Sequence, residues 1–176
     1  RLPFAVVATD VVTGRETPMR KGLVWRAVQA STSVPGIFPS VLLHGRHLVD
    51  GGLVNPVPSQ TVRHLGADIV IAVDLMSSSA RGHHVRAAAS NGRVPKARLP
   101  NLVEMLLRAN EIMQEEVTLR SAATANITIA PALGPVRWSD FSRRGKEFIA
   151  LGEEAARDKF PEMEQLMPFL AVGGAR

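Results

Sequence analysis

Three aspartates stand where a carboxylate could do chemistry, because each follows an apolar run of the sequence. Asp10 ends the run of residues 3–9, Asp74 ends the run of residues 67–73, and Asp50 follows a shorter one. Ligands of open α/β sheets bind outside the carboxyl ends of the strands, so Asp10 and Asp74 could serve a metal-dependent phosphotransferase. We favour the plainer interpretation for these two, which is turn capping at a strand end. An aspartyl nucleophile of the phosphatase type is usually followed by a second aspartate two residues later. Two residues after Asp10 the sequence has Val12 instead.

Asp50 differs because two glycines follow it and leave its carboxylate little shielded by side chains. Glycines at such a point allow a substrate or another stretch of backbone to approach closely. Asn55 and two prolines follow and would stiffen the exit from this turn. The alternative interpretation is an ordinary tight turn, in which Asp-Gly is common.

The histidines offer a weaker candidate. No pair has the helical i, i+4 spacing with an intervening glutamate that a zinc protease needs. Two of them precede Asp50 in a predicted hairpin, so a His–Asp relay is an alternative to exposed loop histidines. The five histidines are His44, His47, His64, His83 and His84.

Strands that alternate with helices must position these residues, which predicts an α/β fold. We expect strands at residues 3–9, 67–75 and 126–130, a short strand antiparallel to the first, and a hairpin over residues 40–49. We expect helices at residues 21–31, 59–65, 101–123, 142–160 and 161–170. The long third helix should bury an apolar stripe made of Leu102, Leu106, Ala109, Met113 and Val117.

Composition narrows the classes of protein. Aromatic residues make up 5% of the chain, so its core must rely on aliphatic side chains, as buried parallel sheets do. The chain has no cysteine, which excludes disulfides and thiolate metal sites. No apolar run approaches the ~18 residues that span a bilayer. These features favour a cytoplasmic location.

The net charge of +5 fits ordinary solubility or attraction to an anionic lipid surface. Nucleic-acid binding is disfavoured, because the basic residues are not interleaved with aromatics and no such motif is present. Residues 76–100 carry five Lys or Arg and no acidic residue, and we expect them to form a mobile basic surface excursion. Peripheral contact with a membrane is an alternative role for this segment.

Five segments of the sequence, taken together, are more specific evidence for a protein family than any one of them alone. They are residues 30–39 (ASTSVPGIFP) and 48–58 (LVDGGLVNPVP), together with residues 4–10 (FAVVATD), 13–16 (TGRE) and 66–75 (GADIVIAVDL). This set resembles the patatin-like phospholipase family, and especially its small bacterial members. The resemblance is strong over residues 2–75 and looser towards the C-terminus.

The resemblance implies a three-layer α/β/α fold with a mostly parallel central sheet, of which residues 1–170 would form the C-terminal part. It also implies a serine acyl hydrolase, an esterase or phospholipase A-type enzyme, with a Ser–Asp dyad, no catalytic histidine, no metal and no cofactor. Asp50 matches the dyad aspartate. The residues that would line the pocket or support the dyad are Ser31, Ser33, Pro35, Gly36, Phe38, Gly51, Gly52 and Asn55.

The family's glycine-rich oxyanion segment and its Gly-x-Ser-x-Gly nucleophile are absent from these 176 residues. The first residues already read as a core strand without an initiator Met, so we expect a preceding segment to supply the serine. The isolated chain should then be inactive, and the substrate should be a lipid or another acyl ester. A close relative of this activity is acyl transfer. The alternative from a different class is a regulatory or adaptor protein on the same fold.

A site that uses Asp in place of His as the general base must raise the pKa of that Asp. A free aspartate has a pKa ~2.6 units below that of histidine, which makes it a poor base in water. Burial beside apolar walls raises the pKa of a carboxyl group. Ile37, Phe38, Leu53 and Val54 are the candidates for such walls.

Overall fold

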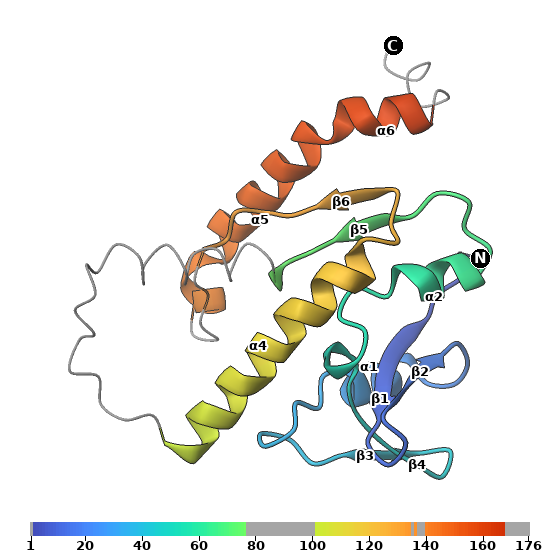
Figure 1. The fold of residues 1–176 in the computed structure, drawn as a ribbon, viewed down its shortest axis with the longest axis vertical. Coiled ribbons are helices and arrows are strands. Elements are labelled where there is room, and N and C mark those ends of the chain that lie inside the picture. The colour runs from blue at the N-terminus through green and yellow to red at the C-terminus, as the bar shows by residue number, and fades with distance from the viewer. Residues whose placement is uncertain (1, 77–100, 135, 137–139, 168–176) are drawn as a thin grey trace.

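The structure is a computed structural model, and it describes residues 2–76, 101–134, 136 and 140–167. The predicted basic excursion lies outside the described residues, apart from Met76. Two sheets and several helices make up the described part, in a mixed α/β arrangement (Figure 1).

The larger sheet has four strands in the order β2-β1-β4-β3. The strands are β1 (Val6–Asp10), β2 (Arg15–Met19), β3 (Val41–Leu43) and β4 (Arg46–Asp50). All three pairings are antiparallel, and β1 lies inside the sheet, as its apolar run predicts. The hairpin β3–β4 turns at His44 and Gly45, which both have positive φ, as a type I′ turn requires.

The second sheet pairs β5 (Ile71–Val73) with β6 (Ile127–Ile129) in parallel. The α/β class with a parallel sheet is therefore confirmed. The expectation of a mostly parallel sheet needs a correction, because parallel pairing within the described residues is confined to these two strands. For two of the three antiparallel pairings the physical reason is connection length. Short turns join β1 to β2 and β3 to β4, and only antiparallel strands can be joined so closely.

Helix α1 (Val24–Ser31) packs on β1 and β4, with Ala30 in a core cluster beside Ala8 and Leu48. A 3-10 turn, η1 (Gly51–Leu53), and α2 (Ser59–His64) follow β4. Gly66, just after the C-cap of α2, has a positive φ. A second cluster joins α2's entry to β5 through Val57, Ala72 and Ala122. Helices α5 (Phe141–Asp158) and α6 (Phe160–Leu166) complete the described part.

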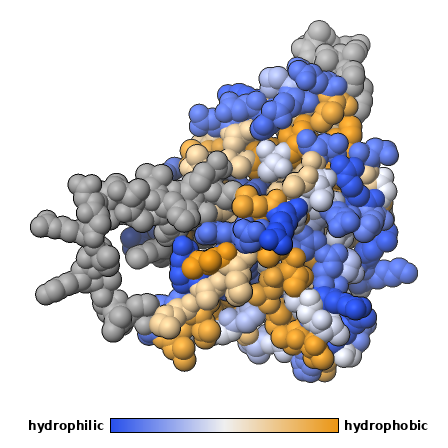
Figure 2. Space-filling model, in the orientation of Figure 1, coloured by the Kyte–Doolittle hydropathy of each residue, from blue (hydrophilic) through white to orange (hydrophobic). Residues whose placement is uncertain are grey.

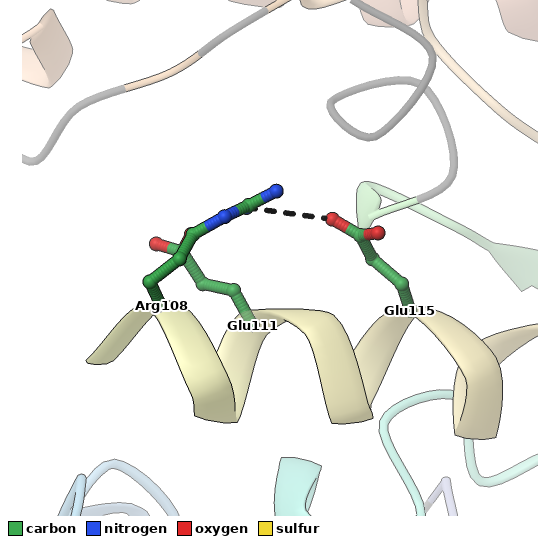
Figure 3. Close-up of polar contacts among 3 residues, drawn as sticks. All are labelled: Arg108, Glu111 and Glu115. Atoms are coloured by element: carbon green, nitrogen blue, oxygen red, sulfur yellow. Dashed lines mark hydrogen bonds and ion pairs between the residues drawn. The ribbon is translucent and has the colours of Figure 1, made fainter. Parts of the chain in front are cut away.

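Helix α4 (Leu102–Ala122) begins at a capping box, in which Asn101 and Glu104 each bind the other's backbone N–H. Nη1 of Arg108 lies 2.9 Å from a carboxylate oxygen of Glu111 and 3.7 Å from one of Glu115 (Figure 3). Arg108 thus forms ion pairs with residues one turn and two turns further along the helix. Exposed pairs of this kind contribute little individually, about 0.3–0.5 kcal/mol. The helix is thus supported by its own cap and charges.

The apolar stripe predicted for α4 is mostly wrong. Leu102, Leu106 and Met113 are all more than half exposed, and Figure 2 shows hydrophobic surface over the lower end of this helix. The helix instead contacts η1 and α2. Of the predicted stripe, Val117 is half-buried. The other buried or half-buried residues of the helix are mixed in character and are Leu107, Arg108, Asn110, Gln114, Glu115, Thr118, Ser121 and Ala122. Periodicity locates an apolar stripe, but the neighbours that the fold supplies decide which face is buried.

Candidate active site

Strand pairing and two hydrogen bonds hold the main chain of Asp50 in place. It ends β4 and stands opposite Ala8 of β1. Its N–H donates to the carbonyl of Ser33 at 3.0 Å, and its own carbonyl accepts from Thr9 Oγ1 at 2.8 Å. The sheet and the segment after α1 therefore set the direction in which the Asp50 side chain leaves the backbone.

The carboxylate of Asp50 is half-buried and is held by one hydrogen bond. Its Oδ1 accepts from the N–H of Gly52 at 2.7 Å. Burial raises the pKa of Asp50, and the Gly52 hydrogen bond lowers it by less, so the pKa lies above its ordinary value of 3.8. A raised pKa makes this carboxylate a better proton acceptor than a free aspartate.

This shift predicts a stability effect for Asp50→Asn. Because the folded-state pKa lies above the unfolded one, the folded protein binds more protons between those values, and stability falls as pH rises through that window. At neutral pH the wild type carries the full cost of the charge, and asparagine removes it. We expect the melting temperature of the variant to be equal to or above that of wild type at pH 7. Any gain should vanish near pH 3.8 and below. A variant that melts lower than wild type at pH 7 would contradict this expectation.

The two glycines after Asp50 allow two different close approaches. A Cβ on Gly51 would collide with the backbone carbonyl of Val7, so β1 and η1 touch directly. A Cβ on Gly52 would meet the end of the Gln114 side chain and Oδ1 of Asp50. Gly51 therefore lets the sheet close against η1, and Gly52 lets the end of the Gln114 side chain come close to η1 beside Asp50.

Ser31 and Ser33 hold the main chain beside the site. Ser31 Oγ donates to the carbonyl of Val7, and Ser33 Oγ donates to the carbonyl of Gln29, both at 2.7 Å. Both hydroxyls are thus engaged in packing α1 and its exit against neighbouring backbone. Their positions suit support of Asp50, since the Ser33 carbonyl receives its N–H.

The segment after Ser33 forms part of an open groove of about 400 Å³. Gly36 has a positive φ of 86°, which favours glycine, and follows Pro35 in the turn. Phe38 is half-exposed and lines the groove together with Ser33 and Arg26. Asp50 is not among the residues that line this groove, so the groove and the Asp50 carboxylate are separate features of the structure.

Asn55 is engaged away from the carboxylate of Asp50. Its Nδ2 donates to Glu16 Oε2 at 2.5 Å, and Thr61 Oγ1 donates to the other oxygen of Glu16 at 3.0 Å. Glu16 thereby ties the β1–β2 hairpin to the loop after η1 and to α2. The sequence placed Glu16 in one of the matched motifs but gave no signal that it meets Asn55 and Thr61, since these partners are 39 and 45 residues away.

The competing aspartates behave as turn caps. Asp10 Oδ1 accepts from the N–H groups of Val12 and Thr13. Burial raises the pKa of Asp10, but these hydrogen bonds outweigh it and leave the pKa below its ordinary value. Asp74 Oδ1 accepts from the N–H of Met76 in the same manner. The pKa of Asp50 is therefore shifted in the opposite direction to that of Asp10.

No histidine of the described residues hydrogen-bonds to Asp50. His47 Nδ1 lies 3.2 Å from Ser40 Oγ, and His44 occupies the hairpin turn. Across the described ranges, no cluster of three or more His, Asp or Glu could hold a metal ion. None of the helices described has the length and apolar character to cross a bilayer.

Comparison with known proteins bears on the same segment. The profile of the patatin-like phospholipases matches residues 2–62, which include β1, β4 and the Asp-Gly-Gly turn. The chain belongs to the patatin-like phospholipase family. An uncharacterised NTE family protein of Mycobacterium tuberculosis is 35% identical over 79 residues, covering 45% of this chain and 22% of that protein.

Two further relatives agree with this assignment. Patatin-like phospholipase domain-containing protein 7 of Rattus norvegicus is 36% identical over 78 residues, 43% of this chain and 6% of that protein. A second uncharacterised NTE family protein of Mycobacterium tuberculosis is 32% identical over 152 residues, 81% of this chain and 25% of that protein. The chain thus spans a quarter or less of each of these relatives.

Proposed function

We propose that the complete protein containing these residues is a serine acyl hydrolase of the esterase or phospholipase A type, with Asp50 as the base of a Ser–Asp dyad. The observation that carries this proposal is Asp50 itself. It is held at a strand end by main-chain hydrogen bonds, its pKa is raised by burial, and Gly52 adds no side chain beside it. It also lies within the segment that matches the family.

The chemistry would follow the usual order for a serine hydrolase. Asp50 takes the proton of the serine hydroxyl as the oxygen attacks the ester carbonyl. Donors near the carbonyl oxygen stabilise its developing negative charge. The leaving alcohol receives the proton from Asp50, and an acyl-enzyme remains. Water then attacks the acyl carbon and gives a proton to Asp50. Asp50 passes this proton to the serine oxygen as the bond between that oxygen and the acyl carbon breaks, which regenerates the serine hydroxyl and releases the carboxylic acid.

The nucleophile in this proposal lies outside the 176 residues. No serine in the sequence has a glycine two positions away on both sides. Ser31 and Ser33 also have their hydroxyls bound to backbone carbonyls. The partner of Asp50 is therefore proposed to come from another part of the complete protein.

The isolated 176-residue chain should hydrolyse no ester, because it lacks a nucleophile in the required context. The measurement is release of p-nitrophenol and of fatty acid from phospholipid, for the complete protein and for this chain side by side. We expect turnover by the complete protein only. Turnover by the isolated chain above a heat-treated control would contradict the placement of the nucleophile. A complete protein that is folded, carries no serine in the nucleophile motif and is inactive would favour an adaptor role.

A further inference from the structure

The outer side of α1 exposes large apolar side chains. Ala27 and Ala30 are its buried residues, and they lie on the side that packs on the four-stranded sheet. The large apolar residues of the helix and of the segments next to it are half-exposed or more, and they are Leu23, Val24, Trp25, Val28 and Phe38. Exposed apolar side chains that gather in one place mark contact with another molecule.

The charges around these apolar residues are all positive. Residues 17–49 contain four Lys or Arg and no Asp or Glu. Arg20, Lys21 and Arg26 are exposed, and none of the ion pairs in the described part of the chain involves them. The guanidinium carbon of Arg26 lies 5.8 Å from the centre of the Trp25 ring, so a cation and an indole stand side by side. These three cations and the five exposed apolar residues are called the α1 surface.

The open groove beside α1 continues this surface. Arg26 and Gln29 line it from the helix, and Phe38 and Val41 line it from the segment that leads into β3. Arg26 is the one charged residue among those that line the groove. The hollow therefore joins a cation to apolar walls, which is the combination that an anionic amphiphile can fill.

Helix α4 also exposes apolar residues, but its charges differ. Leu102–Ala122 contains four Glu and two Arg, so this helix carries a net negative charge. An anionic partner is repelled there and attracted to the α1 surface. Charge thus distinguishes two exposed apolar regions of the same molecule and assigns an anionic partner to α1.

We propose that the α1 surface docks the complete protein on an anionic lipid bilayer. Trp25 has the amphipathic ring that favours the boundary between water and lipid, and it stands at the centre of the outer side of α1. Each basic residue at such a surface raises the affinity for anionic lipid by about fivefold. These residues lie outside the basic segment 76–100, for which the sequence alone suggested a membrane role. Docking requires neither Asp50 nor a nucleophile, so this inference goes beyond the proposed function.

The test is co-sedimentation of the complete protein with vesicles of ether-linked phosphatidylcholine, with and without ether-linked phosphatidylglycerol. An esterase cannot cleave ether lipids, so the result does not depend on the proposed function. We expect binding to increase with phosphatidylglycerol and to decrease with added salt. Trp25→Ser should weaken it by about tenfold or more, and Arg26→Gln by about fivefold.

The matched controls exchange exposed residues of the same kinds elsewhere in the chain. Phe160→Ser on α6 removes a half-exposed aromatic ring, and Arg143→Gln on α5 removes an exposed cation. Both should bind vesicles as the wild type does. Wild-type binding by Trp25→Ser and Arg26→Gln, or equal losses in the controls, would overturn the inference.

A second readout follows Trp25 itself and does not depend on how well Trp25→Ser folds. The difference in fluorescence between the wild type and Trp25→Phe isolates the emission of this residue. Acrylamide should quench that emission in the free protein, and vesicles with brominated acyl chains should shift it to the blue and quench it. Emission that is already shielded from acrylamide without vesicles would mean that another part of the complete protein covers α1. Vesicle binding that leaves this emission unchanged would place the contact on another face, and either result overturns the docking role.

Discussion

Asp50→Asn is expected to lower kcat/KM of the complete protein for an ester by ~10³-fold or more, with the fold retained. Asparagine keeps the shape of the side chain, and its Oδ1 can still accept from the Gly52 N–H. It cannot accept the serine proton. Asp10 and Asp74 cannot replace it, because both are turn caps at other positions.

The measurement is steady-state kinetics on purified variants, with thermal melts to verify folding. His44→Ala and His47→Ala are the matched controls, since neither side chain bonds to Asp50 in the structure, and each should cost little. A folded Asp50→Asn enzyme within about tenfold of wild type, which is only ~1.4 kcal/mol of barrier, would show that another group is the base. A large loss in either histidine variant would revive the His–Asp relay.

The parts of the fold that sequence predicts well are those set by neighbouring residues. The hairpin over residues 40–49 was predicted from strand-forming runs on both sides of residues 44–46, and in the structure its turn is confined to His44 and Gly45. The start of α4 was predicted from Asn101 as its cap, and the structure adds Glu104 as the partner in a capping box. Helix α2 ends at His64, close to Gly66 as expected. The placement of Asp50 at a strand end likewise needed only the run before it and the glycines after it.

The parts that sequence could not predict depend on contacts between distant segments. The buried face of α4 depends on packing against η1, so a stripe that periodicity marks as core lies on the surface. Asn55 was expected at the site because of its neighbours, but Glu16 from the first hairpin binds its amide. Gln114 had no local signal, because the residues it meets are more than 60 positions away. A local pattern identifies the residues that can do chemistry, and the packing of distant elements decides which of them meet.

Gly51→Ala should be the most destabilising small substitution near the site. The alanine Cβ would overlap the carbonyl oxygen and carbon of Val7, which belong to the backbone of a strand inside the four-stranded sheet. A backbone cannot rotate away as a side chain can. Either β1 separates from η1 or the hydrogen bonds that fix Asp50 are lost, and we expect a loss of about 3 kcal/mol or more in the free energy of unfolding.

Gly52→Ala is the matched control, because it adds the same methyl group one residue later. Its Cβ would meet the end of the Gln114 side chain, which can move, so unfolding should change by less than about 1 kcal/mol. The same methyl would stand between Gln114 and Asp50, and ester turnover should fall although the fold survives. Urea unfolding of both variants of the complete protein, followed by kinetics on the folded one, measures the two effects separately. Equal stability of the two variants would mean that β1 and η1 do not touch at Val7 as the structure has them.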